Sequence, residues 1–223
     1  MDTGIRVVIA GNPGLHPLTV DSVELGYDRA LPRFGSSLRM SAYVQRYRDL
    51  ISQPFGAPPV FGPGGILLKA ANVGSSDAAG VEIGIKSNTG SGLRWQASYA
   101  YAVTTDDTLL NRGGLITSPI DYGHSTPHHV VLGGLGYTRG RLEMDLLARW
   151  QSSYRDFETT VVPLVLQPVQ VRNYLLLSGR IGYRLTDDLS VALSLQQFNA
   201  AHQLQTAGPP VERRAIVSLT ADF

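Results

Sequence analysis

The sequence LRWQASYAYAV, at residues 93–103, decides the fold class because apolar side chains recur in it at every second position. The apolar positions are Leu93, Trp95, Ala97, Tyr99, Tyr101 and Val103. The positions between them begin with Arg94, Gln96 and Ser98. Successive side chains of a β-strand point to opposite faces, so this period of two predicts a strand with one apolar face and one mostly polar face.

The same period continues through most of the chain. It is clearest at residues 38–44, 81–86, 142–150, 175–184, 189–195 and 215–223. No segment shows a convincing helical period, and no apolar run approaches the roughly 18 residues of a membrane-spanning helix. The sequence therefore predicts an all-β fold.

The composition excludes several classes of function. Nineteen basic and 18 acidic side chains leave a formal net charge of +1, which provides no basic excess for binding nucleic acid. The chain has no cysteine, so disulfides, thiolate metal sites and cysteine nucleophiles are excluded. Charged residues make up only 17% of the sequence. Soluble domains carry about 25%, so part of this surface is expected to face something other than water.

The connections between the predicted strands alternate in length. Short, turn-forming connections are expected at residues 30–36, 89–92, 138–140 and 186–188. Long connections rich in Gly, Pro, Asp, Asn or Ser are expected at residues 50–64, 104–127, 152–172 and 199–212. This alternation predicts an antiparallel meander whose short turns lie at one end and whose long loops lie at the other.

The alternation holds only if residues 65–88 form a single crossing. A turn within them would place two short connections in succession, so we predict one long strand interrupted by a bulge around residues 74–80. The meander then has nine strands. A hairpin at residues 74–80 would instead favour a barrel of about ten strands.

Aromatic residues gather at both ends of the predicted strands. Beside the short turns or the terminus lie Tyr27, Tyr137, Tyr183 and Phe223, and beside the long loops lie Tyr99, Tyr101, Trp150 and Phe198. Two aromatic belts, short turns, long loops and alternating strands are typical of transmembrane β-barrels. A soluble β-sandwich that acts as a binding module is an alternative, but it gives no reason for segregated loops.

An odd strand number indicates that the sheet is part of something larger. An open sheet in a membrane would leave the backbone groups of two edge strands unpaired in hydrocarbon, which is costly. Met1-Asp2-Thr3 offers no basic region, so we expect no signal peptide at this end of the chain. The chain is therefore interpreted as a portion of a larger barrel.

Several motifs, taken in order along the chain, resemble those of the TonB-dependent outer-membrane receptors. They are NPGLHP at 12–17, ELGY at 24–27, YRDLI at 47–51, Asn72 followed by AAGVE at 78–82, and a terminal strand at 217–223. The sequence departs from the family pattern in two places. Leu18 replaces an acidic residue, and QQFN at 196–199 replaces the family's Asn-Leu-Phe element.

The resemblance implies an architecture. Residues 1–18 would be an N-terminal extension leading into the first strand, and residues 19–223 would be a partial receptor barrel. They would form the C-terminal part of a barrel of about 22 strands. The plug domain and the TonB box of the family are not found in this sequence.

The resemblance also implies a function, with no catalysis and no cofactor. The parent protein would sit in the outer membrane of a Gram-negative bacterium and take up a scarce ligand, most often a ferric siderophore. Its partners would be outer-membrane lipid, the barrel-assembly machinery, which recognises a terminal Phe such as Phe223, and the TonB complex, reached only through the missing N-terminal part. A small autonomous porin or barrel enzyme is the alternative.

Two groups of residues are candidates for functional contacts. Charged residues on the polar face are expected to face the lumen, where they could line a substrate path, contact the plug or simply be tolerated by water. They are Glu24, Glu82, Arg94, Glu143, Asp145, Arg149 and Arg180. Long-loop residues are candidates for ligand contact, because loops on a rigid scaffold carry recognition. They are Phe55, Phe61, Tyr154, Arg155, Phe157 and His202.

One segment contains histidines together with a serine and an aspartate, residue types that occur in hydrolase and metal sites. His124, Ser125, His128 and His129 lie near Asp121 in the sequence. Adjacent strand residues point to opposite faces, so His128 and His129 are not expected to converge on one ion. We therefore predict polar residues at a loop-to-strand boundary, with no metal site.

Overall fold

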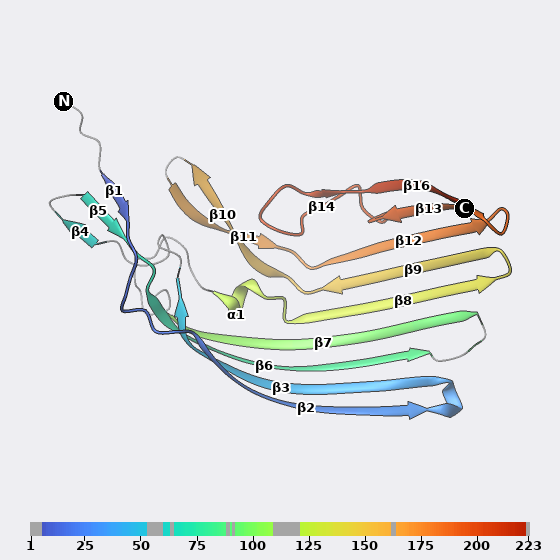
Figure 1. Cartoon of the computed structure of the whole chain (residues 1–223), viewed down its shortest axis with the longest axis horizontal. Coiled ribbons are helices and arrows are strands. Elements are labelled where there is room, and N and C mark those ends of the chain that lie inside the picture. The colour runs from blue at the N-terminus through green and yellow to red at the C-terminus, as the bar shows by residue number, and fades with distance from the viewer. Residues whose placement is uncertain are drawn as a thin grey trace.

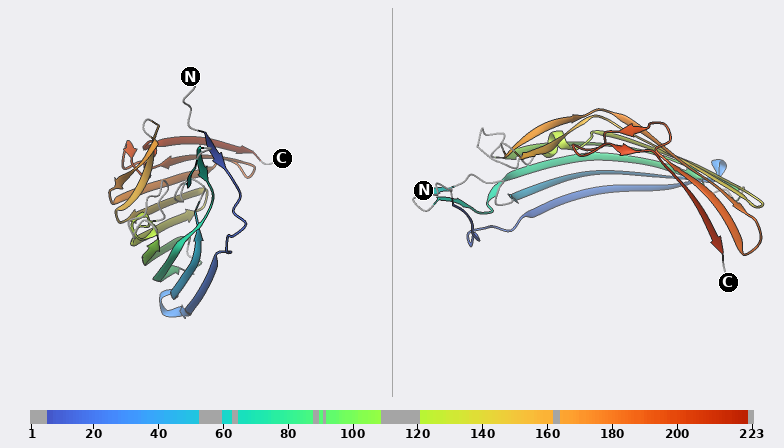
Figure 2. Two further views of the ribbon diagram at one scale, coloured as in Figure 1. Left: turned by 90° about the vertical axis from the view of Figure 1, so that its left-hand side faces the viewer. Right: turned by 90° about the horizontal axis from the view of Figure 1, so that it is seen from above.

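The computed structural model describes residues 6–52, 60–62, 65–87, 90, 92–108, 121–161 and 164–221 of the 223-residue chain. Its main element is a nine-stranded antiparallel sheet that is curved and open (Figures 1 and 2). Each strand pairs with its neighbours in chain order. The strands are β2 (Thr19–Leu31), β3 (Ser36–Ile51), β6 (Asn72–Ser87), β7 (Leu93–Thr108), β8 (His129–Arg139), β9 (Leu142–Gln151), β12 (Tyr174–Arg184), β13 (Leu189–Gln196) and β16 (Arg214–Ala221). The predicted all-β meander of nine strands is confirmed.

Short and long connections lie at opposite ends of this sheet (Figure 1). The short connections are η1 (Pro32–Phe34) with the following Gly35, and residues 88–92, 140–141 and 185–188. Gly35 has a φ of 51°, a left-handed conformation that glycine adopts without strain. The long connections are residues 52–71, 109–128, 152–173 and 197–213. The predicted segregation of loop lengths is confirmed.

The long-loop end carries additional secondary structure (Figure 1). A three-stranded sheet contains β1 (Val7–Ile9), β5 (Gly65–Leu68) and β4 (Val60–Gly62), with β1 parallel to β5. Two hairpins follow, β10 (Tyr154–Val161) with β11 (Leu164–Val171), and β14 (His202–Gln203) with β15 (Val211–Glu212). The helix α1 (Tyr122–Ser125) precedes β8. In the described part of the chain, no helix is long and apolar enough to cross a membrane.

Residues 65–88 contain one crossing, but its limits and its bulge differ from the prediction. The crossing is β6, which begins at Asn72, because Gly65–Leu68 pairs with β1 and β4 outside the main sheet. The pairing of β3 with β6 shifts in register twice, on either side of Leu50, which pairs with Gly74. Between Tyr47 and Leu50 the extra residue lies in β3, and between Leu50 and Ile51 the extra residue is Val73 of β6. Asp49 takes a φ of 57° in this part of β3. The irregularity therefore lies at residues 72–76 of β6, at the beginning of the predicted range and before it.

The pairing register separates the two faces of the main sheet. Arg94, Gly136, Asp145 and Arg180 are cross-strand partners in turn, so they share one face. By the same alternation, this polar face carries all seven charged residues predicted to face a lumen. The opposite, apolar face carries Trp95, Tyr99, Leu146, Leu193 and Leu219.

The apolar face is largely uncovered. Leu25 is 75% exposed and Val217 is 73% exposed, while the fully buried apolar residues of the described chain are few. A β-sandwich would require a second sheet packed on this face, about 10 Å away. The described residues provide no such sheet, because the smaller sheets lie at the long-loop end (Figure 1).

The aromatic residues near the short turns follow a diagonal across the register. Tyr27 of β2 is level with Tyr99 of β7, through Met40 and Ile83. Tyr137 of β8 is instead level with Leu93, further toward the short turns. Strands of a barrel tilt by about 35–45°, so positions at one height drift along the register from strand to strand. The tyrosines shift along the register in this way, as expected for an aromatic belt that lies at one height on tilted strands.

The aromatic residues near the long loops drift in the same direction. Tyr101 lies beyond Tyr99 on β7, and Trp150 of β9 is level with Tyr99 through Val131. The Phe198 ring, after β13, lies 3.7 Å from the position of a Cβ on Gly179, still further toward the short turns. The two diagonals therefore run side by side and enclose an apolar band.

Candidate functional site

Four of the predicted lumen residues form one ionic network on the polar face. The Arg94 guanidinium lies 3.2 Å from an Asp145 carboxylate oxygen and 3.7 Å from a Glu143 oxygen. Arg180 donates to the other Glu143 oxygen at 2.8 Å. Arg94 also donates to the Thr138 hydroxyl at 2.6 Å. The network joins β7, β8, β9 and β12 near their short-turn ends.

A glycine makes room for this network. Gly136 stands between Arg94 and Asp145 in the register. A Cβ on Gly136 would lie 2.8 Å from an Asp145 oxygen and 3.0 Å from Arg94 Nε. The bare backbone of β8 therefore lets two side chains from its flanking strands meet above it. Charges in this arrangement are paired but solvent-exposed, so they contribute little to stability.

The other predicted lumen residues lie on the same face but outside this network. Glu24 is paired in the register with Tyr43, and Glu82 with Ser41 and Ala100. Arg149 is paired with Leu132 and Leu176. All three are exposed.

The predicted ligand-contact residues occupy different parts of the long-loop end. Phe61 on β4 is 73% exposed, and His202 on β14 is exposed. Phe157 on β10 is half-buried. Phe55 lies outside the described residues, as does the terminal Phe223. The described members of this group are distributed over β4, β10 and β14.

Tyr154, Arg155 and Asp156, at the start of β10, connect three long loops. The Tyr154 hydroxyl donates to the Gln205 carbonyl, and the Ala207 amide donates to Asp156 at 2.7 Å. Arg155, between them, points to the other loop and lies 3.5 Å from the buried Asp121 carboxylate. Two predicted ligand contacts, Tyr154 and Arg155, therefore hold loops together. A sequence signal for the two strands of this hairpin exists in the β-branched residues at 159–161 and at 165, 169 and 171.

Replacing Tyr154 by phenylalanine is expected to release the loop at residues 205–207. The lost hydrogen bond is worth about 0.5–1.5 kcal/mol. Burial raises the pKa of the Tyr154 hydroxyl above 10.0. The contact is therefore expected to persist at neutral pH and to weaken only as the pH rises above the ordinary tyrosine range. Hydrogen exchange at residues 205–207 measures both effects, and unchanged exchange in Tyr154→Phe would contradict this role.

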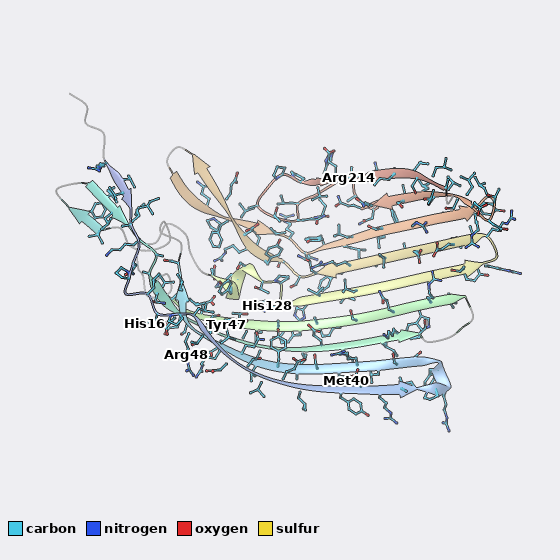
Figure 3. The ribbon with its side chains drawn as sticks, in the orientation of Figure 1. His16, Met40, Tyr47, Arg48, His128 and Arg214 are labelled. Atoms are coloured by element: carbon cyan, nitrogen blue, oxygen red, sulfur yellow. The ribbon has the colours of Figure 1, made fainter. Side chains whose placement is uncertain are left out.

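Hydrogen bonds of two asparagine side chains attach the segment before β2 to the first long loop and to the start of β6. The Asn72 side chain accepts from the His16 amide and donates to the His16 carbonyl, both at 2.9 Å, and it also donates to the Asp49 carbonyl. Asn12 donates to the Ala70 carbonyl at 2.9 Å. Figure 3 shows His16 beside Tyr47 and Arg48 at this end of the sheet. The two asparagines of the sequence motifs thus have a structural role here.

The side chains of the histidine group contact different partners. His128 Nδ1 lies 2.8 Å from the Ala102 carbonyl, while His129 Nδ1 lies 2.9 Å from the Tyr99 hydroxyl on the apolar face. His124 is paired with Asp121 at 2.6 Å. Among the described residues, no three His, Asp or Glu side chains are placed to hold a metal ion together.

A comparison with protein families decides the assignment. The sequence profile described as TonB dependent receptor-like, β-barrel matches residues 2–198. This chain belongs to that family. No curated protein matches the chain at a significant level.

Solved structures of this barrel type share the fold at low sequence identity. The FrpB iron transporter from Neisseria meningitidis (F3-3 variant) has a TM-score of 0.73 at 17% identity, over 97% of this chain and 33% of that one. The ferric enterobactin receptor PfeA from Pseudomonas aeruginosa, as a mutant, has a TM-score of 0.68 at 17% identity, over 96% and 32%. The ferripyoverdine receptor of the Pseudomonas aeruginosa outer membrane has 0.66 at 17%, over 94% and 28%. The chain thus spans about a third of the length of these relatives.

Proposed function

We propose that this chain is the C-terminal part of the barrel wall of a TonB-dependent outer-membrane receptor that imports a ferric siderophore. The observation that carries the proposal is the nine-stranded meander with one apolar face and segregated loops. Its membership of the receptor-like barrel family supports it. So do structural neighbours that include an iron transporter and two receptors for ferric ligands.

In this proposal the two faces of the sheet have different surroundings. The apolar face contacts lipid of the outer membrane of a Gram-negative bacterium. The polar face, with the network of Arg94, Asp145, Glu143 and Arg180, lines a water-filled lumen. A lumen tolerates such charges, whereas lipid would not. The function is transport without catalysis, and the terminal Phe223 is the signal for the barrel-assembly machinery.

The long-loop end faces the outside of the cell, where the ligand arrives. The contacts of Tyr154, Arg155 and Asp156 hold the described loops in a fixed arrangement, and fixed loops bind a ligand at a lower entropic cost. Phe61 and His202, both exposed there, remain candidates for ligand contact. Energy from the TonB complex would reach this part only through a plug domain and TonB box.

Uptake of radioactive ferric siderophore tests the proposal in cells that lack their own siderophore receptors. A complete receptor that carries this chain is expected to restore uptake only in cells that contain TonB. The same uptake without TonB would contradict the proposal and favour a porin.

The chain alone, exported with an added signal peptide, provides a second test. It is expected to give no uptake, because β2 and β16 are edge strands without barrel partners. TonB-dependent uptake by the chain alone would show that neither a plug nor further strands are needed, and would also contradict the proposal.

A further inference from the structure

Four charged residues lie on the apolar face where the apolar band ends. Asp21, Arg46 and Asp77 are cross-strand partners on β2, β3 and β6. They follow directly after the apolar row formed by Val23, Val44 and Ala79, on the long-loop side. Arg48 is the next residue of β3 on this face, two residues beyond Arg46 toward the long loops. Figure 3 labels it at this end of the sheet. We call Asp21, Arg46, Arg48 and Asp77 the charged row.

The charged row consists of two ion pairs with alternating signs. Arg46 donates to both Asp77 oxygens, from Nε at 2.7 Å and from Nη2 at 3.3 Å. Arg48 Nη2 lies 2.9 Å from an Asp21 oxygen. The four side chains remain between 56% and 65% exposed. The ion pairs therefore fix the positions of the charges without burying them.

Both arginines keep the capacity for a further acceptor. A guanidinium has five N–H donors. In the described part of the chain, Arg46 uses Nε and Nη2, and Arg48 uses Nη2. Arginine binds phosphate oxygens well because its donors match them in pairs. The row can thus bind phosphate while its aspartates stay in place.

The surroundings of the charged row fit a ligand that is polar at one end and apolar at the other. An open groove of about 780 Å³ adjoins it. The groove is lined by the charged row and, on the side of the apolar band, by Val23, Val44 and Val103. A free phosphate ion would use only the charged part of this groove. A phosphorylated lipid would use both parts.

We propose that the charged row binds phosphorylated headgroups of the outer-leaflet lipid. Arg46 and Arg48 donate to phosphate oxygens, and Asp21 and Asp77 share the divalent cations that bridge neighbouring phosphates. The alternating signs of the row complement a layer of phosphates and divalent cations. This assignment rests on the proposed function, because that function places the apolar face in lipid and the long loops outside.

Lipid retention by the complete receptor tests this assignment. The receptor is reconstituted in bilayers that contain a phosphorylated glycolipid and Mg²⁺, extracted in detergent, and examined by native mass spectrometry. Joint replacement Arg46→Gln and Arg48→Gln is expected to lower the retained glycolipid at least about fivefold, and chelation of Mg²⁺ is expected to lower it in the unmodified protein. Arg139→Gln is the matched control, since Arg139 lies on the same face at the short-turn end.

Each outcome has a distinct meaning. Equal retention by the double variant and the unmodified protein would overturn the assignment while leaving the proposed function intact. Displacement of the glycolipid by millimolar inorganic phosphate would also overturn it, because the site would then be one for free phosphate. If the unmodified receptor failed to enter the bilayer, the proposed function and this assignment would both fall. Heat-modifiable gel mobility confirms that each variant has folded.

Discussion

Replacing Leu146 by arginine is expected to destabilise the membrane-inserted barrel by about 2–4 kcal/mol, the cost of a charge facing lipid near the midplane. Leu146 lies in the middle of β9 on the apolar face, paired with Leu135 on one side and Gly179 on the other. It is 41% exposed in the isolated sheet. Urea titration of folding into phospholipid vesicles, for a receptor barrel that carries this chain, measures the loss.

Ser98→Arg provides the matched control for this prediction. Ser98 lies on the polar face of β7, between Gly84 and Leu132, where the proposed lumen contains water. An arginine there is expected to change the urea midpoint little. If Ser98→Arg destabilised the barrel and Leu146→Arg did not, the assignment of the two faces would be reversed.

Replacing Gly74 by alanine is expected to separate the start of β6 from the end of β7. Gly74 has a φ of 144°, a region that side-chain-bearing residues rarely adopt. Such strain costs about 1–3 kcal/mol. A Cβ there would also overlap with the Asp107 carbonyl oxygen and lie 2.8 Å from Thr108 Cα. Because these are backbone atoms, they cannot rotate away.

Gly84→Ala tests whether the effect is specific to this position. Gly84 lies in the same strand, and a Cβ there would be 3.6 Å from the Ser98 Cβ, an ordinary contact. Hydrogen exchange at the long-loop ends of β6 and β7 is expected to rise in Gly74→Ala and to remain unchanged in Gly84→Ala. Equal exchange in the two variants would show that the conformation of Gly74 is not required.

The sequence predicted the main sheet because the signals for it are local. Alternation along residues 93–103 marks a strand without reference to any other segment. Loop composition then gives the connection lengths, and their order requires one crossing in residues 65–88. These signals are repeated in every strand, so the strand number and the two faces follow from the sequence alone.

The long-loop end was harder to predict because distant segments determine it. Gly65–Leu68 lies just before β6 in the chain and was predicted to belong to the same crossing, but it pairs with Val7–Ile9, which precedes the main sheet. Arg155 is an exposed loop residue in sequence, and only the fold places Asp121 beside it. Alternation specifies which face a side chain occupies, whereas such partners depend on how loops meet in space.

The two edge strands of the main sheet point the same way. β2 runs into the short connection η1, and β16 also runs toward the short-turn end, since it is antiparallel to β13. A second copy of this sheet in the same membrane orientation would therefore offer β2 only a parallel partner. Antiparallel closure instead requires an inserted segment with an odd number of strands, the first and last of which run toward the long loops. The direction of the two edge strands therefore shows, without reference to any side chain, that further strands of this kind can close the barrel and that a second copy of the sheet cannot.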